Sequence, residues 1–395
     1  MQSKGFWLII TKKVRIFAGM KKFIFVFLLL MAAVGRGEVP RISLLTALPG
    51  EEIYELEGHT GLRVRSADAD YVVNWGIFDF NSPGFVYRFC KGETDYLCAA
   101  YPSEFFFDDY ARQRRQVIEQ QVMLDSIQTM RLIGLLESNL RPENRVYRYN
   151  YVKDNCATRP LMLIEQALGE PLIASGGEET TFRREMTEYH RDFPWYQFGI
   201  DLALGCGIDK PIGRREAIFA PVRLARELEG NPHIGPIVTH GEQKIVHSRT
   251  PFLLTPVALG WLMLILALAL RGKVGKVFDS VMFGLFGLTG CILFFLVFFS
   301  SHEATSPNLL LLWLNPLCFL GAIIPWLKSA KKLKVWYFFI NFALLIVFAL
   351  LLFPMGRHLN AAMLPLLMAD AIRSAANLKS IYGDKIHKWP KISRR

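Results

Sequence analysis

The chain has 395 residues, 52% of them hydrophobic and 21% charged, with a mean hydropathy of +0.24. This composition is too apolar for an ordinary soluble enzyme, so part of the chain is expected to lie in lipid. The net charge of +11 comes from residues 251–395, where 15 Lys and Arg stand against 4 Asp and Glu. Residues 37–250 carry 24 basic and 31 acidic side chains, which argues against a nucleic acid partner.

The first 36 residues are predicted to be a signal peptide or an N-terminal extension. Two lysines precede the apolar run Phe23–Val34, which is about the length of a signal-peptide core and shorter than an ordinary membrane span. Small residues follow the run, and whether the signal is cleaved stays open. In either case residues 37–230 face outward as one domain, and the Pro- and Gly-rich residues 231–250 are expected to be a linker.

The outward-facing domain is predicted to mix helices and strands. Alternating apolar residues predict strands over Thr60–Val64 and Tyr71–Trp75, joined by a polar turn. The stretch Phe85–Ala99 is expected to form a hairpin around Gly92. Apolar residues at helical spacing predict a helix over Ser126–Leu140.

The C-terminal third is predicted to be a small helical membrane domain. Four uncharged apolar windows, each near the roughly 20 residues that a bilayer requires, cover residues 251–270, 280–300, 309–327 and 335–355. A fifth window, 359–376, contains Asp370 and Arg373, but counting it as a span keeps every Lys-rich loop in the cytoplasm, as the positive-inside rule requires. We therefore predict five spans within residues 251–377 and a basic cytoplasmic tail over residues 378–395.

Of the six cysteines, Cys156 has the most distinctive setting. It stands in the sequence DNCATRP at residues 154–160, directly before an apolar helical stretch, and is predicted to lie at a capped helix N-terminus. Unpaired amides and the helix dipole there favour the nucleophilic thiolate. The alternative is a buried structural cysteine or a disulfide. Cys90 and Cys98, on either side of the predicted hairpin turn, are a candidate disulfide pair.

A cysteine nucleophile requires a base, and His59 is the candidate. It begins a predicted strand whose neighbour contains Asn74 near its end, so the two side chains can lie side by side. Asn74 would hold the imidazole in the tautomer that accepts the thiol proton, as in Cys-His-Asn enzymes. The alternative is that His59 is a hydrogen-bonded core histidine. His233, His240 and His247 lack the accompanying ligands of a metal site and are expected to be solvated near the membrane.

Several segments resemble known families. The order His then Asn on paired strands, followed by Asn-Cys at a helix start, is similar to the permuted papain-like fold of the lecithin retinol acyltransferase and NlpC relatives. The segments EGHT at 57–60, NWGIFDF at 74–80 and residues 147–159 more specifically resemble the periplasmic domain of the Lnb lipoprotein N-acyltransferases. The resemblance covers residues 42–222 and extends into the membrane part. It implies an α+β papain-like periplasmic domain followed by an all-α domain of about five helices in a bacterial inner membrane.

The resemblance also implies thiol acyl transfer. Cys156, activated by His59 and Asn74, would take an acyl chain from a membrane phospholipid as a thioester and pass it to the N-terminal cysteine amine of a diacylated lipoprotein. Residues near these catalytic groups are expected to bind substrate: Asn155, Arg159, Tyr151 and Trp75. The partners would be the lipid bilayer, its phospholipids as donors and lipoproteins as acceptors, with no metal or organic cofactor required.

Two other functions are compatible with the sequence. A membrane-anchored cell-wall amidase or endopeptidase would use the same Cys156 and His59, and would keep its activity without the membrane domain. A non-enzymatic membrane receptor would only bind a partner, and replacing Cys156 by serine would leave its function unchanged.

Overall fold

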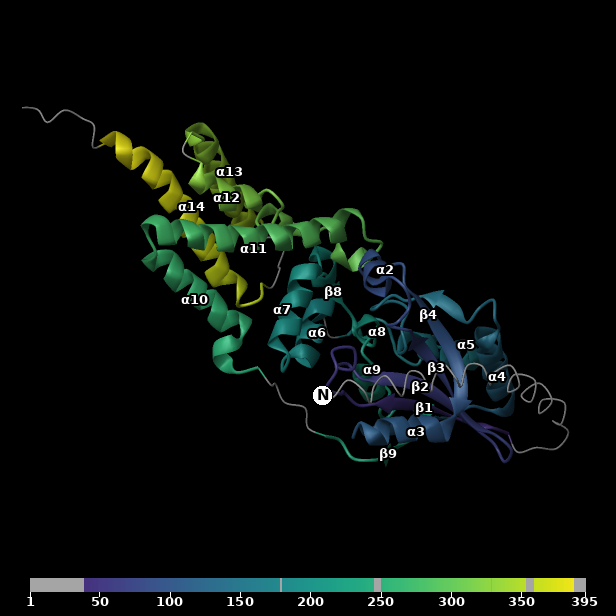
Figure 1. Cartoon of the computed structure of the whole chain (residues 1–395). Coiled ribbons are helices and arrows are strands. Elements are labelled where there is room, and N and C mark those ends of the chain that lie inside the picture. Colours follow the sequence, from purple (N-terminus) through teal and green to yellow (C-terminus); the bar gives the residue numbers. More distant parts are fainter. Residues whose placement is uncertain (1–38, 178–179, 245–249, 328, 353–358, 387–395) are drawn as a thin grey trace, which may run out of the picture.

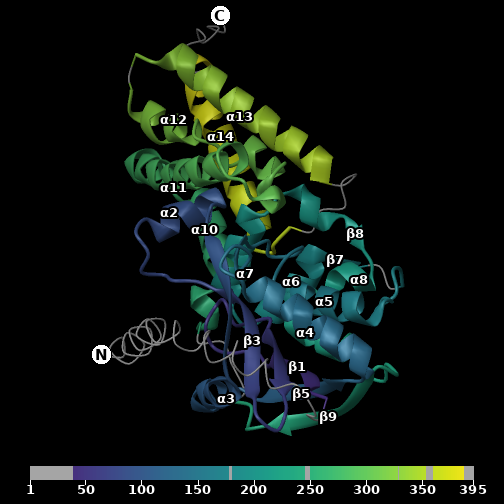
Figure 2. The ribbon, with the colours of Figure 1, turned by 90° about the vertical axis from the view of Figure 1, so that its right-hand side faces the viewer.

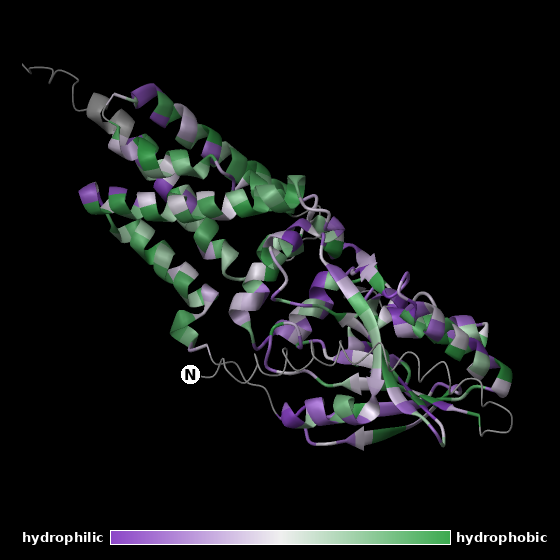
Figure 3. Ribbon diagram, turned by 45° about the vertical axis from the view of Figure 1, so that its right-hand side comes forward, coloured by the Kyte–Doolittle hydropathy of each residue, from purple (hydrophilic) through white to green (hydrophobic). Residues whose placement is uncertain are grey.

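The structure is a computed structural model that describes residues 39–177, 180–244, 250–327, 329–352 and 359–386. A sheet-rich outer domain (39–244) lies end to end with a helical domain (250–386) (Figure 1). The outer domain is mixed α and β, as predicted, and the helical domain is visibly more apolar (Figure 3). The predicted signal peptide and the end of the basic tail lie outside the described residues.

Seven strands of the outer domain form one antiparallel sheet in the order β6-β4-β3-β2-β1-β5-β9. Their bounds are Arg41–Ala47 (β1), His59–Arg65 (β2), Asp70–Ile77 (β3), Asp95–Pro102 (β4), Val117–Val122 (β5), Val146–Arg148 (β6) and Ile234–His240 (β9). The predicted strand pair is confirmed, since β2 and β3 are central neighbours with Gly61 opposite Asn74. A second, two-stranded sheet joins Thr180–Thr181 (β7) to Pro211–Ile212 (β8).

Helices cover both faces of the large sheet (Figure 2). The helices of the outer domain are Phe85–Lys91 (α2), Ser103–Arg112 (α3), Ser126–Leu140 (α4), Thr158–Leu168 (α5), Phe182–His190 (α6), Pro194–Ala203 (α7), Arg214–Ala217 (α8) and Pro221–Glu227 (α9), with a 3-10 turn at Cys206–Asp209 (η1). The helix predicted over Ser126–Leu140 is confirmed. Its N-cap Asp125 accepts a hydrogen bond from the Gln128 amide at 2.7 Å, which stabilises the first turn.

The two faces of the sheet bury alternate residues of the same strands. Leu44 of β1 packs with Leu132 of α4 and Leu161 of α5 in the main core. The next residue along β1, Leu45, packs with Phe106 of α3 in a smaller core on the opposite face. Successive side chains of a strand point to opposite faces, so this sheet is enclosed on both sides and its strands read as apolar runs.

The prediction of a hairpin over residues 85–99 is wrong for its first strand. Phe85–Lys91 forms the helix α2, and β4 begins only at Asp95. The turn itself occurs where predicted, because Gly92 adopts a left-handed conformation and ends α2. Cys90 on the helix and Cys98 on the strand are both free thiols, so the candidate disulfide does not form.

The prediction of a linker over residues 231–250 is wrong for its first half. Ile234–His240 forms β9, an edge strand paired with β5. His240 Nε2 lies 2.7 Å from a Glu119 carboxylate oxygen, so this histidine belongs to the outer domain rather than to a solvated segment. His233 likewise lies 3.0 Å from Glu170, while His247 falls outside the described residues.

The helical domain contains four of the five predicted helical segments as continuous helices. Its elements are Phe252–Leu254 (η2), Pro256–Ala269 (α10), Gly272–Phe298 (α11), Glu303–Thr305 (η3), Leu309–Leu312 (η4), Cys318–Ile323 (α12), Ile324–Trp326 (η5), Lys331–Leu352 (α13) and Met363–Ile386 (α14). Among the residues that the structure describes, α11 and α13 are long and apolar enough to cross a membrane, and α10 is a shorter apolar helix.

The third predicted span, residues 309–327, is not one helix. It is divided into η4, α12 and η5, because Pro316 interrupts it and the Asn315 side chain accepts a hydrogen bond from the Leu317 amide at 3.1 Å. A Cβ on Gly290 of α11 would stand only 2.3 Å from the Asn315 carbonyl carbon, so the broken segment packs directly on α11. Irregular backbone at membrane depth is tolerated where protein covers it in this way.

Polar side chains bind the helical domain together from inside. Asp370 of α14 is fully buried and accepts hydrogen bonds from Asn341 of α13 at 2.7 Å and from Trp313 at 3.1 Å. Arg373, also on α14, pairs with Asp279 of α11, with a second contact between Nη2 and Oδ2 at 3.0 Å. These buried partners connect α14 to three other parts of the domain.

Candidate active site

His59 is the first residue of β2, and the backbone before it is tightly constrained. Gly58 has φ of 84°, and a Cβ there would stand 2.6 Å from the carbonyl oxygen of Ala47. Only glycine fits this left-handed conformation against β1, so the chain enters β2 at a fixed place. The ring of Tyr110, from α3, stacks on the His59 ring with centroids 6.5 Å apart.

His59 and Asn74 are hydrogen-bonded, as predicted from the strand pairing. His59 Nε2 lies 2.5 Å from Asn74 Oδ1, and Asn74 Nδ2 donates to the Tyr101 hydroxyl at 2.7 Å. An amide oxygen can only accept, so His59 Nε2 carries a proton and donates it to Asn74. In the neutral imidazole, Nδ1 is then the nitrogen that can accept a proton.

Cys156 lies two residues before α5, and Asn155 caps that helix. The Asn155 side-chain oxygen accepts hydrogen bonds from the amides of Ala157 at 2.8 Å and Thr158 at 3.0 Å. The thiol sulfur lies against the start of β2, where it accepts a hydrogen bond from the backbone amide of Thr60, the residue after His59. The structure therefore brings the three predicted residues Cys156, His59 and Asn74 to one place.

Burial raises the pKa of Cys156 to about 11. The hydrogen bond from the Thr60 amide opposes this rise, and the negative charge of Glu57 adds to it. This rise in pKa is opposite to the lowering expected at a helix N-terminus. Only 7% of Cys156 is exposed, and removal from water disfavours the charged form. At neutral pH the resting group is a thiol, so a nucleophile requires removal of its proton.

The raised pKa predicts slow, pH-dependent alkylation of Cys156. With a pKa of about 11, only about one thiol in a thousand is ionised at pH 8. The alkylation rate with iodoacetamide is therefore expected to increase about tenfold per pH unit between pH 8 and pH 10. Peptide mass spectrometry of the full-length protein in detergent measures this rate, with Cys90 on α2 as an internal reference. A rate that stays constant from pH 7 to pH 9 would instead indicate a stable thiolate and contradict the prediction.

Two residues expected to bind substrate are buried and hydrogen-bonded within the protein. Asn155 is 3% exposed, and its amide nitrogen donates to the carbonyl oxygens of Tyr151 at 2.7 Å and Phe219 at 2.8 Å. Trp75 is fully buried in the main core and donates to the Asn139 side chain at 3.4 Å. Asn155 therefore positions Cys156 and Trp75 fills the core, while their contact with substrate stays a prediction.

The other two predicted binding residues are already paired within the protein. Arg159 forms an ion pair with Asp154, with Nη2 and Oδ2 2.8 Å apart, and its guanidinium lies 3.6 Å from the ring centre of Tyr147. Tyr151 is partly exposed and donates to a Glu57 oxygen at 2.5 Å. Arg159 would have to leave Asp154 to bind a phosphate, so its geometry favours a role in holding the start of α5.

Sequence reasoning missed the polar groups behind His59. Glu57 is 9% exposed and lies 3.4 Å from Nε2 of His190 on α6. His190 Nδ1 in turn lies 3.1 Å from the side-chain oxygen of Gln197 on α7. These residues are distant in the sequence and no local pattern joins them. Two buried ionisable side chains near a candidate site are nevertheless a recognisable signal once the fold is known.

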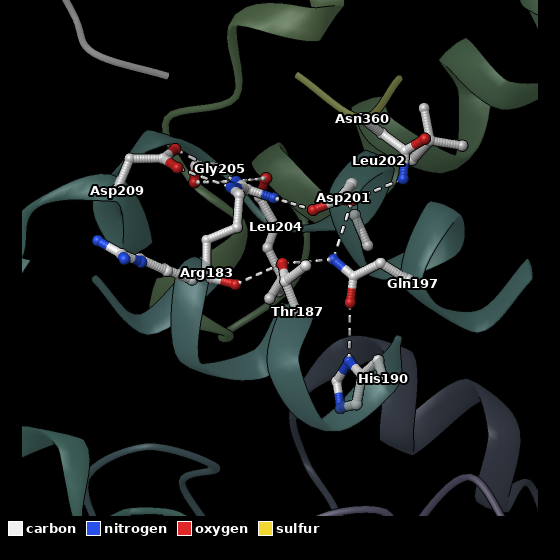
Figure 4. A network of polar contacts seen from close by, with 12 residues as sticks. Arg183, Thr187, His190, Gln197, Asp201, Leu202, Leu204, Gly205, Asp209 and Asn360 are labelled. Carbon is white, nitrogen blue, oxygen red and sulfur yellow. Dashed lines mark hydrogen bonds and ion pairs between the residues drawn. The ribbon is translucent and has the colours of Figure 1, made fainter. Parts of the chain in front are cut away.

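The same network continues into the helical domain (Figure 4). Gln197 donates to Asp201 at 2.9 Å, and Asn360, just before α14, donates to the same carboxylate oxygen at 2.9 Å. Arg183 joins Asp201 at 2.9 Å to Asp209 at 2.7 Å. A continuous series of polar contacts therefore leads from the helical domain to Glu57, beside the candidate site.

A second set of contacts joins the two domains at the loop after α11. His302 Nε2 lies 2.7 Å from the carbonyl oxygen of Phe89, and the Ser301 amide donates to the carbonyl oxygen of Lys91 at 2.8 Å. Phe89 and Lys91 both belong to α2. Glu303 forms an ion pair with Lys153, three residues before Cys156. The segment that carries Cys156 thus contacts the helical domain.

Comparison with known families covers both domains. The sequence model of the Lnb N-terminal periplasmic domain matches residues 37–188, which include the three candidate catalytic residues. The sequence model of the Lnb transmembrane domain matches residues 247–385. The chain belongs to the Lnb family. No curated protein and no solved structure matches it.

Membership of the Lnb family confirms the resemblance predicted from the sequence. It identifies a membrane protein of the lipoprotein N-acyltransferase type, in which a periplasmic domain precedes a transmembrane domain. It also implies that lipoproteins and membrane lipids are the partners of this protein. The helical domain is therefore the transmembrane domain, and the outer domain faces the periplasm.

Proposed function

We propose that this protein transfers an acyl chain from a membrane phospholipid to the N-terminal cysteine amine of bacterial lipoproteins, through a thioester on Cys156. The main support is geometric: a buried thiol lies beside a hydrogen-bonded His59–Asn74 pair, in a segment that contacts the transmembrane domain. Both substrates are anchored in the membrane, so an active site next to that domain meets them at high effective concentration.

In the first step, His59 Nδ1 accepts the Cys156 thiol proton and the sulfur attacks an ester carbonyl of the phospholipid. The backbone amide of Cys156, at the start of α5, stabilises the resulting oxyanion, a contribution usually worth about 3 kcal/mol. The carbon–oxygen ester bond breaks as the thioester forms. The leaving alkoxide takes the proton from His59 and departs as lysophospholipid, which leaves the acyl group on sulfur and no change in oxidation state.

In the second step, the α-amino group of the lipoprotein's N-terminal cysteine attacks the thioester. His59 accepts a proton from the attacking amine and returns it to the sulfur as the carbon–sulfur bond breaks. An amide bond replaces the thioester, and Cys156 is again a thiol. The lipoprotein thereby gains one acyl chain and becomes triacylated.

The same proposal extends to architecture. The sequence order His59, Asn74, Cys156, with α5 packed against β2, supports a permuted papain-like fold for the periplasmic domain. We place the catalytic domain at residues 37–244, which adds β9 to the predicted 37–230, and the transmembrane domain at 251–377. Five crossings of the bacterial inner membrane would put the Lys-rich loops and the tail from residue 378 in the cytoplasm.

Mass spectrometry of a lipoprotein's N-terminal lipopeptide tests the proposed reaction. The lipoprotein is produced in cells that lack other N-acylation, with and without this protein. The expected result is a mass increase of one acyl chain when the protein is present. A diacylated peptide in both samples overturns the proposal, and release of cell-wall fragments by the purified protein would establish the hydrolase instead.

A further inference from the structure

A series of aromatic rings leads from Cys156 to the helix α2. Tyr149 donates a hydrogen bond to the Cys156 thiol, and its ring lies 4.4 Å from that of Tyr96. Three more rings continue the series, with centroid distances of 5.1 Å from Tyr96 to Phe78, 5.7 Å from Phe78 to Phe85 and 5.9 Å from Phe85 to Phe89. The thiol and α2 are therefore joined by a continuous series of ring contacts, in which Tyr96 and Phe85 are buried.

The outer side of this series is exposed. Phe80 is 43% exposed and lies against Phe78 at 4.4 Å and Phe85 at 5.1 Å. Tyr54, 46% exposed, covers Phe78 and Phe80 from the loop before β2. A group of large aromatic side chains that the fold leaves partly open to its surroundings marks an interaction surface.

The helix at the far end of the series, α2, lies beside the C-terminal end of α11. Figures 1 and 2 show α2 beside that end of α11, and Tyr87 contacts Phe295 with ring centroids 6.1 Å apart. Val86 and Tyr87 are 73% and 59% exposed on α2, and Phe298 is 61% exposed on α11. The exposed apolar side of α2 therefore continues the lipid-facing surface of the transmembrane domain.

We propose that these aromatic residues form a binding surface for the acyl chain of the phospholipid donor, extending from the bilayer to Cys156. The acyl-chain surface consists of Tyr54, Phe78, Phe80 and Phe89, and the buried Phe85 supports it from beneath. This inference rests on the proposed function and adds the site at which the transferred chain is held. Aromatic faces suit a hydrocarbon chain, and contact with the bilayer at one end and the thiol at the other gives the chain its direction.

Acyl-enzyme formation with donors of two chain lengths tests the surface. Purified full-length protein in detergent is mixed with dipalmitoyl or dihexanoyl phosphatidylethanolamine, and intact mass spectrometry follows the thioester on Cys156. Phe80→Ser is expected to slow acylation from the dipalmitoyl donor about tenfold more than from the dihexanoyl donor, because the longer chain covers more of the rings. Phe80→Leu, which restores apolar contact, is expected to recover most of the lost rate.

The matched control is Phe105→Ser, which removes an aromatic side chain that is 51% exposed on α3. It is expected to leave both rates unchanged. Equal rate losses with both donors, or no loss in Phe80→Ser, would overturn the acyl-chain surface while leaving the proposed function standing. A loss confined to the second step, transfer to a lipopeptide, would assign the surface to the acceptor and also overturn it. Absence of any acyl-enzyme in the native protein would overturn the proposed function itself.

Discussion

Replacement of Cys156 by serine is expected to reduce acyl transfer at least about a thousandfold. The serine hydroxyl is similar in size but far less acidic than a thiol. The site buries this side chain to 7% exposure, and its burial already raises the thiol pKa to about 11. An alkoxide there would be still harder to form, so no acyl-enzyme should accumulate. The measurement follows a labelled acyl chain from phospholipid to a diacylated lipopeptide with the purified protein.

Two further variants complete this experiment. Cys98→Ser changes another buried thiol of the same core and is expected to keep transfer near the native rate. His59→Gln removes the proton acceptor and is expected to slow the first step by about 10²- to 10⁴-fold. If Cys156→Ser retained transfer, another nucleophile would have to exist. If Cys156→Ser lost no more transfer activity than Cys98→Ser, its loss of activity would be explained by reduced stability.

Replacement of Arg183 by alanine is expected to destabilise the protein by about 3–5 kcal/mol. Arg183 is 3% exposed and holds two carboxylates, Asp201 and Asp209, which are 7% and 4% exposed. It also donates to the carbonyl oxygens of Leu204 at 3.0 Å and Gly205 at 3.1 Å. Its loss removes a buried positive charge from two buried carboxylates at the junction with the transmembrane domain. Thermal unfolding in detergent should show a Tm lower by roughly 10 °C.

Arg184, the next residue on α6, gives a matched control because it is exposed. Arg184→Ala is expected to change the Tm by less than about 2 °C. Arg183→Lys keeps the charge but loses the paired geometry with two carboxylates, and an intermediate Tm is expected. Equal Tm values for Arg183→Ala and Arg184→Ala would show that the buried network does not stabilise the junction.

Local sequence signals predicted the parts of the site that depend on neighbouring residues. Alternating apolar residues predicted β2 and β3, and the antiparallel pairing of these strands placed His59 beside Asn74. The predicted cap just before the helix marked a helix start directly behind Cys156, and Asn155 supplies that cap. The helix Ser126–Leu140 was predictable for the same reason, since caps and helical periodicity are read within a few residues.

Long-range contacts account for what the sequence did not reveal. The strand β9 pairs with β5, more than a hundred residues earlier, so its Gly- and Pro-rich segment looked like a linker. α2 was mistaken for a strand because its seven residues are too few to separate the two periodicities. The prediction of a thiolate at Cys156 was wrong, because the effect of burial on the thiol pKa outweighs that of the helix N-terminus. Burial depends on β2 and the rest of the core.

The two separate junctions between the domains have a consequence for how substrates are selected. Asn360, just before α14, binds Asp201 of α7, while α2 and Lys153 are held by the loop after α11. Contacts at two places restrict rotation of the outer domain relative to the transmembrane domain more than a single connection would. The protein itself therefore sets the height of Cys156 above the bilayer. A thiol held at a fixed height reaches only groups that lie at that distance from the bilayer. In the proposed reaction, such a thiol would favour ester and amine groups that the membrane presents at that level over the same groups dissolved in the periplasm.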